Sequence, residues 1–375
     1  MGLFTGKRGI VLGVANDRSI AWSIAEHLHR EGAEIGFTHL PDTGDRPKNQ
    51  NKVGKLVDPI GSKFLMPMDV CNDEHIAAVI EKAVATFGKI DFIVHSIAFA
   101  PPADLTGPTY ACSRNGFKSA MEISAYSLLA VAGAAKKQDA LSPDCSILTL
   151  SYFGGEEVIP GYNLMGICKA ALECCVRYLA SELGPFGTRV NAISAGPLRT
   201  VSSSGVGDFD KMQLVNATIA PLRRNLDVDE VGSMGMVMLS KLSSGMTGEV
   251  VHVDCGFNIM GAPPVDFLSR ISAGTCFRNT SGVWVVGKGV VGNGSGVFFG
   301  RKRQRFLPGY SPKKTPDPLL TPIKRQYRTV EPLIVLTFLS TRILFDEIWH
   351  ESSALDGRSH RRALSIAEQP EAMGL

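Results

Sequence analysis

The chain has 375 residues and a formal net charge of +3, enough sequence for one large domain with an appendage or for two domains. The charge is unevenly spread, because residues 1–265 carry 23 Lys and Arg against 27 Asp and Glu, whereas residues 266–375 carry 16 against 9. The first part therefore has an ordinary mixed-charge surface, which argues against nucleic-acid binding, and the basic excess belongs to the C-terminal part.

The eight cysteines include no C-x-x-C pair and no His/Cys cluster at metal-ligand spacing, and the adjacent Cys174 and Cys175 are poorly placed for a structural disulfide. This pattern predicts no metal site and favours a reducing, cytoplasmic setting.

No secretory signal is expected in the glycine-broken first 13 residues. The longest later apolar run, "EPLIVLTFLSTRILF", contains Glu331 and Arg342 and falls short of a membrane span, so no membrane association is expected.

Strand and helix signals alternate over the first 260 residues. About seven apolar runs have strand length: residues 7–14, 33–39, 62–70, 90–98, 145–151, 188–196 and 248–254. Helix-compatible sequence separates them, most clearly at residues 19–32 and 73–88. Nearly continuous apolar strands that alternate with helices predict a parallel sheet covered on both faces. We therefore expect an α/β, doubly wound, Rossmann-like fold over residues 1–265, with ligands at the C-terminal strand ends.

A candidate phosphate loop, "GVANDRSIA", follows the first strand. Gly13 would allow a tight exit from the strand, and the small Ala15 would let the backbone approach a ligand. Ser19 opens the next helix, either as a plain N-cap or also as a ligand contact, and the helix N-terminus offers N–H groups to a pyrophosphate. The stretch lacks the G-x-G-x-x-G fingerprint, so a glycine-tightened strand–helix turn without a ligand stays open.

Three further loops are expected at the same edge of the sheet. Asp69 follows the third strand and is suited to the adenine amino group, although it could also cap a turn. Residues 95–100, "HSIAFA", follow the fourth strand, and their small side chains would admit an adenosine ribose. Residues 195–200, "AGPLRT", follow the sixth, where a rigid turn with Pro197 and Thr200 suits a carboxamide. Four such loops at one sheet edge agree with one bound dinucleotide. His95, in an apolar strand, is interpreted as a core histidine.

The segment "YNLMGICK" places Tyr162 and Lys169 seven positions apart in a predicted helix. Seven residues are two helical turns, so both side chains are expected on one face, roughly 10 Å apart along the axis. For an arbitrary helix this would be an ordinary surface pair. Here the neighbouring dinucleotide-type loops favour a functional pair.

These motifs together resemble the short-chain dehydrogenase superfamily, specifically the divergent NADH-dependent bacterial enoyl-acyl-carrier-protein reductases. The resemblance covers about residues 2–262 and includes "GVANDRSIAW", "VHSIAFAP", "LTLSYFGGEEVIPGYNLMGICKAALE", "RVNAISAGPLRT" and "GEVVHVDCGF". The tyrosine–x6–lysine spacing is its specific part, because the wider superfamily uses tyrosine–x3–lysine. A second tyrosine ten residues earlier, Tyr152, is also typical of these enoyl reductases.

The resemblance implies reduction of the trans-2 double bond of enoyl-acyl-carrier-protein thioesters by NADH. It implies that the Tyr162 hydroxyl stabilises negative charge on the thioester oxygen, and that Lys169 holds the nicotinamide ribose. Tyr152 is assigned to substrate contact. The implied partners are acyl carrier protein and three further copies of the chain in a homotetramer. The implied cofactor-binding residues are Gly13, Ala15, Ser19, Ile20, Leu40, Asp69, Val70, Ser96, Ile97, Lys169, Pro197, Leu198, Arg199, Thr200, Val201 and Ser202, and the implied substrate-binding residues are Ala98, Ala100, Tyr152 and Tyr162.

Some residues depart from the family pattern. Leu40 stands where many relatives have a glutamine at the adenosine end, and no acidic residue directly ends the second strand. Arg46 and Lys48 follow in a slightly lengthened loop, residues 41–52, and could meet a 2′-phosphate, so NADPH stays open although NADH is favoured. Residues 202–213 match the family's substrate-binding loop.

Residues 266–375 have no counterpart in the family. They are Gly- and Pro-rich, with a basic cluster at Arg301, Lys302, Arg303 and Arg305. One interpretation is an arm for acidic partners such as acyl carrier protein or nucleic acid. The preferred interpretation is a poorly structured extension without a selected function.

Two rival functions stay open. A carbonyl reductase of the same superfamily would show tyrosine–x3–lysine with an upstream serine; Ser151 is present, but residue 166 is glycine. A non-catalytic dinucleotide-binding protein would be expected to lose Tyr162 or Lys169, and both are kept.

Overall fold

The computed structural model describes residues 2–44, 46–105, 107–199, 209–265, 276–278 and 284–286. The chain divides into two units, Met1–Ser295 and Gly296–Leu375, and every element described below belongs to the first. Expectations for Thr200, Val201 and Ser202, and for nearly all of the extension, lie outside the described residues. The predicted domain boundary at residue 265 stays a prediction.

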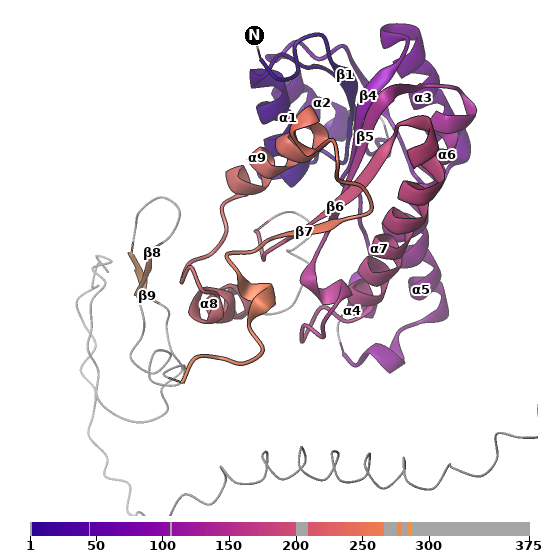
Figure 1. The fold of residues 1–375 in the computed structure, drawn as a ribbon. Helices are drawn as coiled ribbons and strands as arrows, with labels where there is room; N and C mark the ends of the chain where they lie inside the picture. The colour runs from indigo at the N-terminus through magenta and orange to yellow at the C-terminus, as the bar shows by residue number, and fades with distance from the viewer. Residues whose placement is uncertain are drawn as a thin grey trace, which may run out of the picture. The chain divides into compact units, whose positions relative to one another are not determined.

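Seven parallel strands form one sheet in the order β3-β2-β1-β4-β5-β6-β7 (Figure 1). The predicted α/β fold with a parallel seven-stranded sheet is therefore confirmed. Six of the predicted runs contain their strands, whereas β5 starts four residues earlier than the predicted run at Cys145. The strands are β1 (Arg8–Leu12), β2 (Glu34–His39), β3 (Phe64–Pro67), β4 (Ile90–His95), β5 (Leu141–Ser151), β6 (Arg189–Ala195) and β7 (Val250–Val253).

Helices alternate with the strands, as the sequence predicts. Local signals set several of their ends: the Asn72 side chain accepts from the N–H groups of Glu74 and His75 at the start of α3, and Gly88, with φ of +75°, follows its end. The helices are α1 (Ile20–Arg30), α2 (Lys48–Val57), α3 (Asp73–Phe87), α4 (Pro102–Leu105), α5 (Arg114–Met121), α6 (Ser127–Lys137), α7 (Leu164–Leu183), α8 (Phe209–Ile219) and α9 (Val228–Leu239).

Shorter elements complete the described chain. The π-helix η2 (Glu122–Tyr126) joins α5 to α6, and the 3-10 turns are η1 (Thr109–Ala111), η3 (Phe153–Gly155), η4 (Gly184–Phe186), η6 (Lys241–Ser243) and η7 (Phe257–Ile259). Within the C-terminal extension, β8 (Cys276–Arg278) and β9 (Trp284–Val286) form an antiparallel pair. Measured against the length and hydropathy of a bilayer crossing, every helix among the described residues falls short.

The segment after β2 differs from expectation. Residues 41–52 were predicted as a lengthened loop, but α2 begins within them at Lys48. The Asp42 carboxylate accepts hydrogen bonds from the N–H groups of Asn49 at 2.6 Å and Gln50 at 3.1 Å. These bonds satisfy free donors of the first helical turn, so the polar stretch starts a helix instead of extending the loop.

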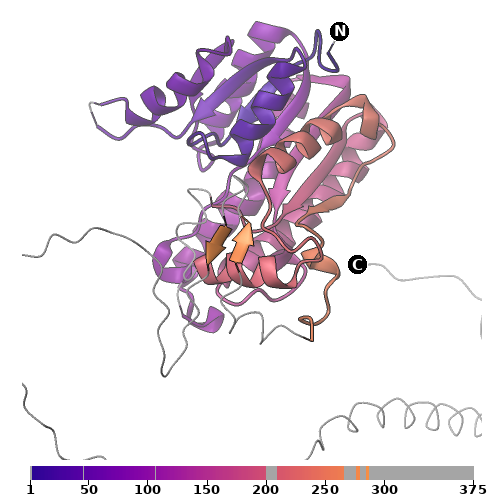
Figure 2. The ribbon, with the colours of Figure 1, turned by 90° about the vertical axis from the view of Figure 1, so that its left-hand side faces the viewer.

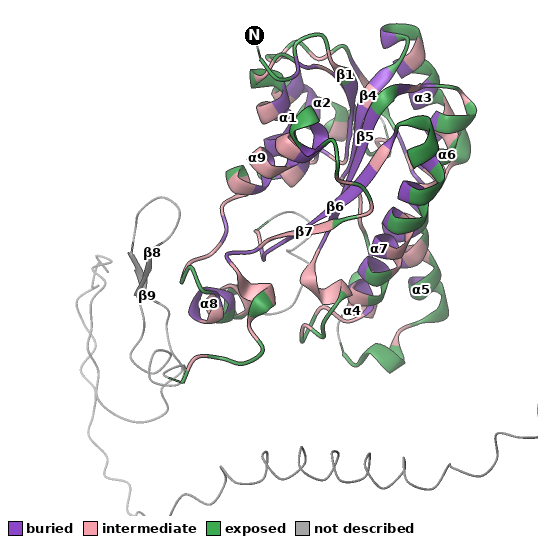
Figure 3. Ribbon diagram, in the orientation of Figure 1, coloured by how far each residue is buried: buried purple, intermediate pink, exposed green. Residues whose placement is uncertain are grey.

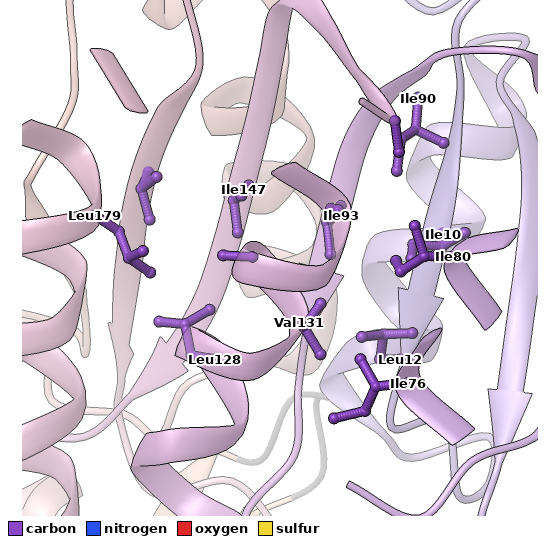
Figure 4. Packing of buried hydrophobic residues seen from close by; sticks show 14 of the residues in the cluster. Ile10, Leu12, Ile76, Ile80, Ile90, Ile93, Leu128, Val131, Ile147 and Leu179 are labelled. Atoms are coloured by element: carbon purple, nitrogen blue, oxygen red, sulfur yellow. The ribbon is translucent and has the colours of Figure 1, made fainter. Parts of the chain in front are cut away.

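Two apolar layers cover the sheet. Helices α3, α6 and α7 pack on one face, where Ile10, Ile80, Ile93, Leu128 and Ile147 belong to one buried cluster (Figure 4). Helices α1, α2 and α9 cover the other face through a second cluster, and Figure 2 shows α1 and α9 side by side in front of the strands. The central strands are buried between these layers, as Figure 3 shows for β1, β4 and β5. Both faces being buried explains the continuous apolar strand sequences.

Ile147 lies on β5 at the centre of the first cluster and is fully buried. We expect Ile147→Ala to lower the free energy of unfolding by about 2–5 kcal/mol, because it leaves a cavity, and Ile147→Val by about 0.5–1.5 kcal/mol. Urea unfolding followed by circular dichroism at one protein concentration measures both. Equal losses for the two variants would contradict this packing.

Candidate functional site

The predicted phosphate loop and the loop after β4 lie against each other. Gly13 leaves β1 with φ of +92°, and a Cβ at this position would collide with the carbonyl oxygen of Ser96. The Ser96 N–H also donates to the Leu12 carbonyl at 3.2 Å. Glycine is required here by both its conformation and its neighbour. The two loops meet between β1 and β4, where the strand order of the sheet reverses.

Ser19 occupies the N-cap position of α1, but its side chain makes no cap hydrogen bond. Its Oγ instead accepts from the N–H groups of Ala15 at 3.1 Å and Asn16 at 3.0 Å. The hydroxyl therefore shapes the loop and leaves the helix N-terminus uncapped, and the first turn, which Ile20 begins, has no acidic residue. Such an N-terminus fits an anionic group such as a pyrophosphate.

The residues predicted at the adenosine end lie at the ends of β2 and β3. Leu40 directly follows β2 and is 66% exposed. Asp69 lies two residues after β3, and its Oδ1 accepts from the Cys71 N–H at 3.0 Å. The carboxylate thus does cap its own turn, which leaves its second oxygen for another donor. Val70 beside it is buried.

The loop after β4 contributes to a small apolar cluster. Ile97 packs on the main core, whereas Ala98 and Ala100 join a separate cluster that includes Met165 and Cys168. Tyr162 packs against the same cluster. The structure therefore brings together Ala98, Ala100 and Tyr162, the residues predicted to contact substrate.

After β6 the chain continues through a largely buried turn. The carbonyl of Pro197 accepts a hydrogen bond from Gln213 Nε2 at 3.4 Å, and Leu198 packs on the second core cluster. Arg199 forms an ion pair with Asp210 on α8. This turn lies at the C-terminal edge of the sheet with the other loops, as predicted.

Tyr162 is not on a helix, contrary to the prediction. Helix α7 begins at Leu164, and Tyr162 lies in the preceding turn, where its N–H donates to the Ile159 carbonyl at 3.0 Å. Positive φ values at Gly161 (+86°) and Asn163 (+42°) interrupt a helical backbone. The two-turn, one-face geometry assumed for Tyr162 and Lys169 is therefore wrong.

The side chain of Asn163 anchors this turn. Its Nδ2 donates to the carbonyls of Leu105 at 2.9 Å and Gly107 at 2.8 Å. The turn is thereby attached to the segment that follows the β4 loop, on the substrate side of the predicted site.

Tyr152 and Tyr162 contact each other edge to face, with ring centroids 4.7 Å apart. Tyr152 follows the end of β5, and its hydroxyl donates to the sulfur of Met212 on α8 at 3.3 Å. Burial, and secondarily Asp254, raises the pKa of Tyr152 to about 12. Burial, followed by Tyr152, Cys168 and Glu173, raises the pKa of Tyr162 above its usual value. Both phenols are therefore protonated at neutral pH.

Lys169 is on α7 and only 6% exposed. Its ammonium donates to the Leu150 carbonyl at 2.6 Å, and among the described residues no carboxylate lies within ion-pair distance of it. An ammonium has three donors, so two remain for ligand hydroxyls such as those of a ribose. Burial lowers the pKa of Lys169 to about 8, against smaller opposite influences of Cys168 and Glu173.

His95 is a satisfied core histidine, as interpreted from the sequence. It is fully buried, with Nδ1 3.0 Å from Thr149 Oγ1 and Nε2 2.8 Å from Ser127 Oγ. Burial, with a further contribution from Lys169, lowers its pKa to about 3, so it stays neutral. In the described parts of the chain, no group of three His, Cys, Asp or Glu side chains is arranged to hold a metal.

Sequence reasoning missed some residues that organise the site. Asn163 and Met212 show no sequence signal, because their contacts join distant segments. Glu173 had one: it follows Lys169 by one helical turn, so a charged residue shares the predicted functional face of α7. Ser151 was considered only as a marker of carbonyl reductases, whereas in the structure its hydroxyl donates to Glu173 Oε1.

The chain is similar to known enoyl-[acyl-carrier-protein] reductases. The family model described as enoyl-(acyl carrier protein) reductase matches residues 13–258. An NADH-dependent enoyl-[acyl-carrier-protein] reductase of Nostoc sp. is 48% identical over 257 residues, which cover 68% of this chain and 98% of that protein. The corresponding Escherichia coli enzyme is 45% identical over 260 residues, covering 69% and 97%.

Solved structures of similar proteins contain dinucleotides. The enoyl-(acyl-carrier-protein) reductase of Anaplasma phagocytophilum in complex with NAD has a TM-score of 0.66 and 43% identity, and covers 70% of this chain and 98% of its own. The Bacillus cereus enzyme with NADP+ and an indole naphthyridinone has a TM-score of 0.66 and 46% identity, covering 70% and 100%.

The titration of Lys169 predicts a pH dependence of NADH binding. Because burial lowers the folded-state pKa to about 8, the ammonium is present below pH 8 and lost as pH rises through it. We expect the Kd for NADH to be nearly constant from pH 6.5 to 7.5 and to rise by about fivefold between pH 8 and pH 9. Fluorescence titration measures the Kd.

Lys169→Met is the control for this titration. It removes the ammonium, so it should bind NADH more weakly and with a flat profile over the same range. A flat profile for the unmodified protein would contradict the assignment of Lys169 to the cofactor.

Proposed function

Because the chain belongs to the enoyl-(acyl carrier protein) reductase family, we propose that it reduces the trans-2 double bond of enoyl-acyl-carrier-protein thioesters with NADH, the last step of the fatty-acid elongation cycle. The observation that carries the proposal is the arrangement of Tyr152, Tyr162 and Lys169 at the C-terminal edge of the sheet. The two tyrosine rings are in contact, and the buried ammonium keeps two donors free.

Tyr162 has the properties of the group that stabilises the reaction's developing charge. Bound NADH supplies the hydride, which is added at C3 of the substrate, and negative charge then develops on the thioester oxygen. A protonated phenol aimed at that oxygen lowers the barrier by donating a hydrogen bond. The raised pKa of Tyr162 keeps its proton in place, and its ring packs against the same apolar cluster as Ala98, which supports a place on the substrate side.

Lys169 and the loops at the sheet edge hold the cofactor in this proposal. The two unused donors of Lys169 bind the nicotinamide ribose, and the uncapped N-terminus of α1 binds the pyrophosphate. Positioning the cofactor against C3 is an orientation effect that these residues supply before reaction. Tyr152 contacts the substrate and supports the ring of Tyr162.

The carbonyl-reductase alternative is disfavoured by packing around α7. A lysine four positions after the tyrosine would stand at Gly166, but a Cβ there would lie 2.6 Å from the Gly154 carbonyl oxygen. The hydroxyl of Ser151, which that chemistry would require, is engaged by Glu173. Residue 166 therefore has no room for a lysine side chain, and Ser151 is not free to act as the serine of a carbonyl reductase.

The adenosine end supports NADH over NADPH. Asp42 places a carboxylate at the N-terminus of α2, three residues beyond β2, and this negative charge disfavours a 2′-phosphate. Arg46 and Lys48 are exposed beside it and would be the candidates for a phosphate contact. Parallel assays with NADH and NADPH decide the preference.

Acyl carrier protein delivers the substrate in this proposal, and a homotetramer in the cytoplasm is the proposed form of the enzyme. Strand β7 is an edge of the sheet, and all its residues are only partly buried. Helix α7 exposes Ile167 at 41% and Tyr178 at 66%. An unpaired strand edge and exposed apolar side chains both favour contacts between copies of the chain.

Tyr162→Phe tests the assignment directly. We expect kcat with a trans-2-enoyl thioester to fall by about 10²–10³-fold, because the variant loses one hydrogen-bond donor to the developing charge, while the Kd for NADH stays within about twofold. Absorbance at the NADH band follows the reaction. Faster turnover of a simple ketone than of the enoyl thioester by the unmodified protein would instead support a carbonyl reductase.

We further propose that residues 1–265 form the reductase domain and that the 266–375 extension has no role in it. All elements that position the site lie before residue 265. A chain ending at residue 265 should therefore keep its kcat/KM within about twofold and keep its oligomeric state, measured by light scattering. A loss of either would show that the extension contributes.

A further inference from the structure

A buried glutamate, Glu173, lies beside the proposed cofactor-binding lysine. It is 4% exposed and lies four residues after Lys169 on α7, so the two side chains are on one face of the helix. Glutamate is rarely this buried unless it is hydrogen-bonded or paired. Its partner is the hydroxyl of Ser151, the last residue of β5, which donates to Oε1.

Two hydrogen bonds join this turn of α7 to the end of β5. Lys169 Nζ donates to the carbonyl of Leu150 at 2.6 Å, and the next residue, Ser151, donates to Glu173. Tyr152 follows directly. These two hydrogen bonds fix the position of the end of β5 along α7. They therefore also fix the position of Tyr152, whose ring contacts Tyr162.

The turn η3 closes over the glutamate and limits its movement. A Cβ at Gly155 would lie 2.8 Å from Glu173 Oε1 and 3.0 Å from the Ala170 nitrogen. A Cβ at Gly154 would collide with the ring of Tyr162. The two glycines thus let the turn lie directly on α7, with the carboxylate on one side and the phenol on the other.

Glu173 is also the anion that acts on Lys169. Two groups oppose the effect of burial on the lysine pKa, Cys168 and Glu173. Burial raises the pKa of the Cys168 thiol to about 11, so it is neutral where Lys169 titrates. The buried His95 is neutral as well, because its pKa is lowered to about 3. The remaining negative charge is that of Glu173.

Other charged groups face Glu173 itself. Burial raises its pKa above the usual range, the Ser151 hydrogen bond lowers it, and Glu156 raises it. Arg177 on the same helix and His252 on β7 lower it. His252 lies 2.8 Å from Glu156, so the charge of one largely offsets that of the other when the histidine is protonated.

We propose that Glu173 is a positioning residue for the reduction: through Ser151 it fixes the strand end that leads to Tyr152, and its charge keeps Lys169 in the ammonium form that binds the cofactor ribose. The inference rests on the proposed NADH-dependent function. Glu173 then has two separable effects. Its hydrogen bond with Ser151, the tether, acts at every pH, whereas its negative charge acts only in the pH range where Lys169 titrates.

The experiment measures the Kd for NADH from pH 6 to 9 and kcat with a trans-2-enoyl thioester for Glu173→Gln. Glutamine keeps the shape and an acceptor for Ser151 but removes the charge. Loss of a nearby opposite charge should move the lysine titration down by about one pH unit, which makes NADH binding about fivefold weaker at pH 8 and leaves it within about twofold at pH 6. A purely structural glutamate would give the same ratio at both pH values, and that result would overturn the proposal.

Two further variants complete the test. Glu182→Gln removes one exposed charge from the same helix and should match the unmodified protein throughout. Ser151→Ala removes the tether and keeps the charge, so kcat should fall about tenfold with the midpoint of the Kd profile unchanged. This variant also decides the matter if Glu173→Gln does not fold, because unchanged kcat in Ser151→Ala would contradict the tether. Failure of the unmodified protein to bind NADH would instead contradict the proposed function.

Discussion

The burial of one ammonium is the constraint on which the site depends. Lys169 lies in the layer between the sheet and α7, where a charge is costly unless polar groups surround it. The chain supplies one carbonyl, from Leu150, and a carboxylate one helical turn away. The ammonium of Lys169 therefore has fewer hydrogen bonds than it can donate, and its pKa is lowered to about 8. In the proposed function, a ligand with two hydroxyls completes the hydrogen bonds of Lys169, so the cost of burying the charge becomes selectivity for the cofactor.

The topology of the sheet brings the other groups to this lysine. Because all seven strands are parallel, their C-terminal ends lie at one edge, and the loops after β1, β4 and β6 meet there. Glycine at residue 13 lets two of these loops approach, and Ser19 orders the first loop without capping α1. Each feature favours an extended anionic ligand, and in the proposed function the lysine adds the contact at the nicotinamide end.

The sequence was sufficient for the fold, because the fold depends on local patterns. Apolar runs and glycine ends located all seven strands and missed only the start of β5. The tyrosine–x6–lysine spacing singled out Tyr162 and Lys169, whose roles stay predictions. The same reasoning failed where a contact joins residues that are far apart in the sequence. Helix α7 starts only after Asn163, whose side chain binds carbonyls 56 and 58 residues away. Asp42 starts α2 inside a polar stretch that was predicted to be a loop. Ser151 and Glu173 meet only because β5 and α7 pack together.

The unusual spacing of the tyrosine and lysine follows from where α7 begins. With three residues between them, a tyrosine four positions before the lysine would be on the helix itself, whereas Tyr162 approaches from a turn held by Asn163. The turn is attached to the segment that follows the β4 loop, and that loop contains Ala98 and Ala100, which are proposed to contact the substrate. The phenol is therefore positioned by the substrate-facing segment and the ammonium by β5 and the helix. The proposed reaction requires the phenol and the ammonium to be held in fixed positions relative to each other. The contact of Tyr152 with Tyr162 provides this, because Tyr152 directly follows the end of β5, which Lys169 and Glu173 bind.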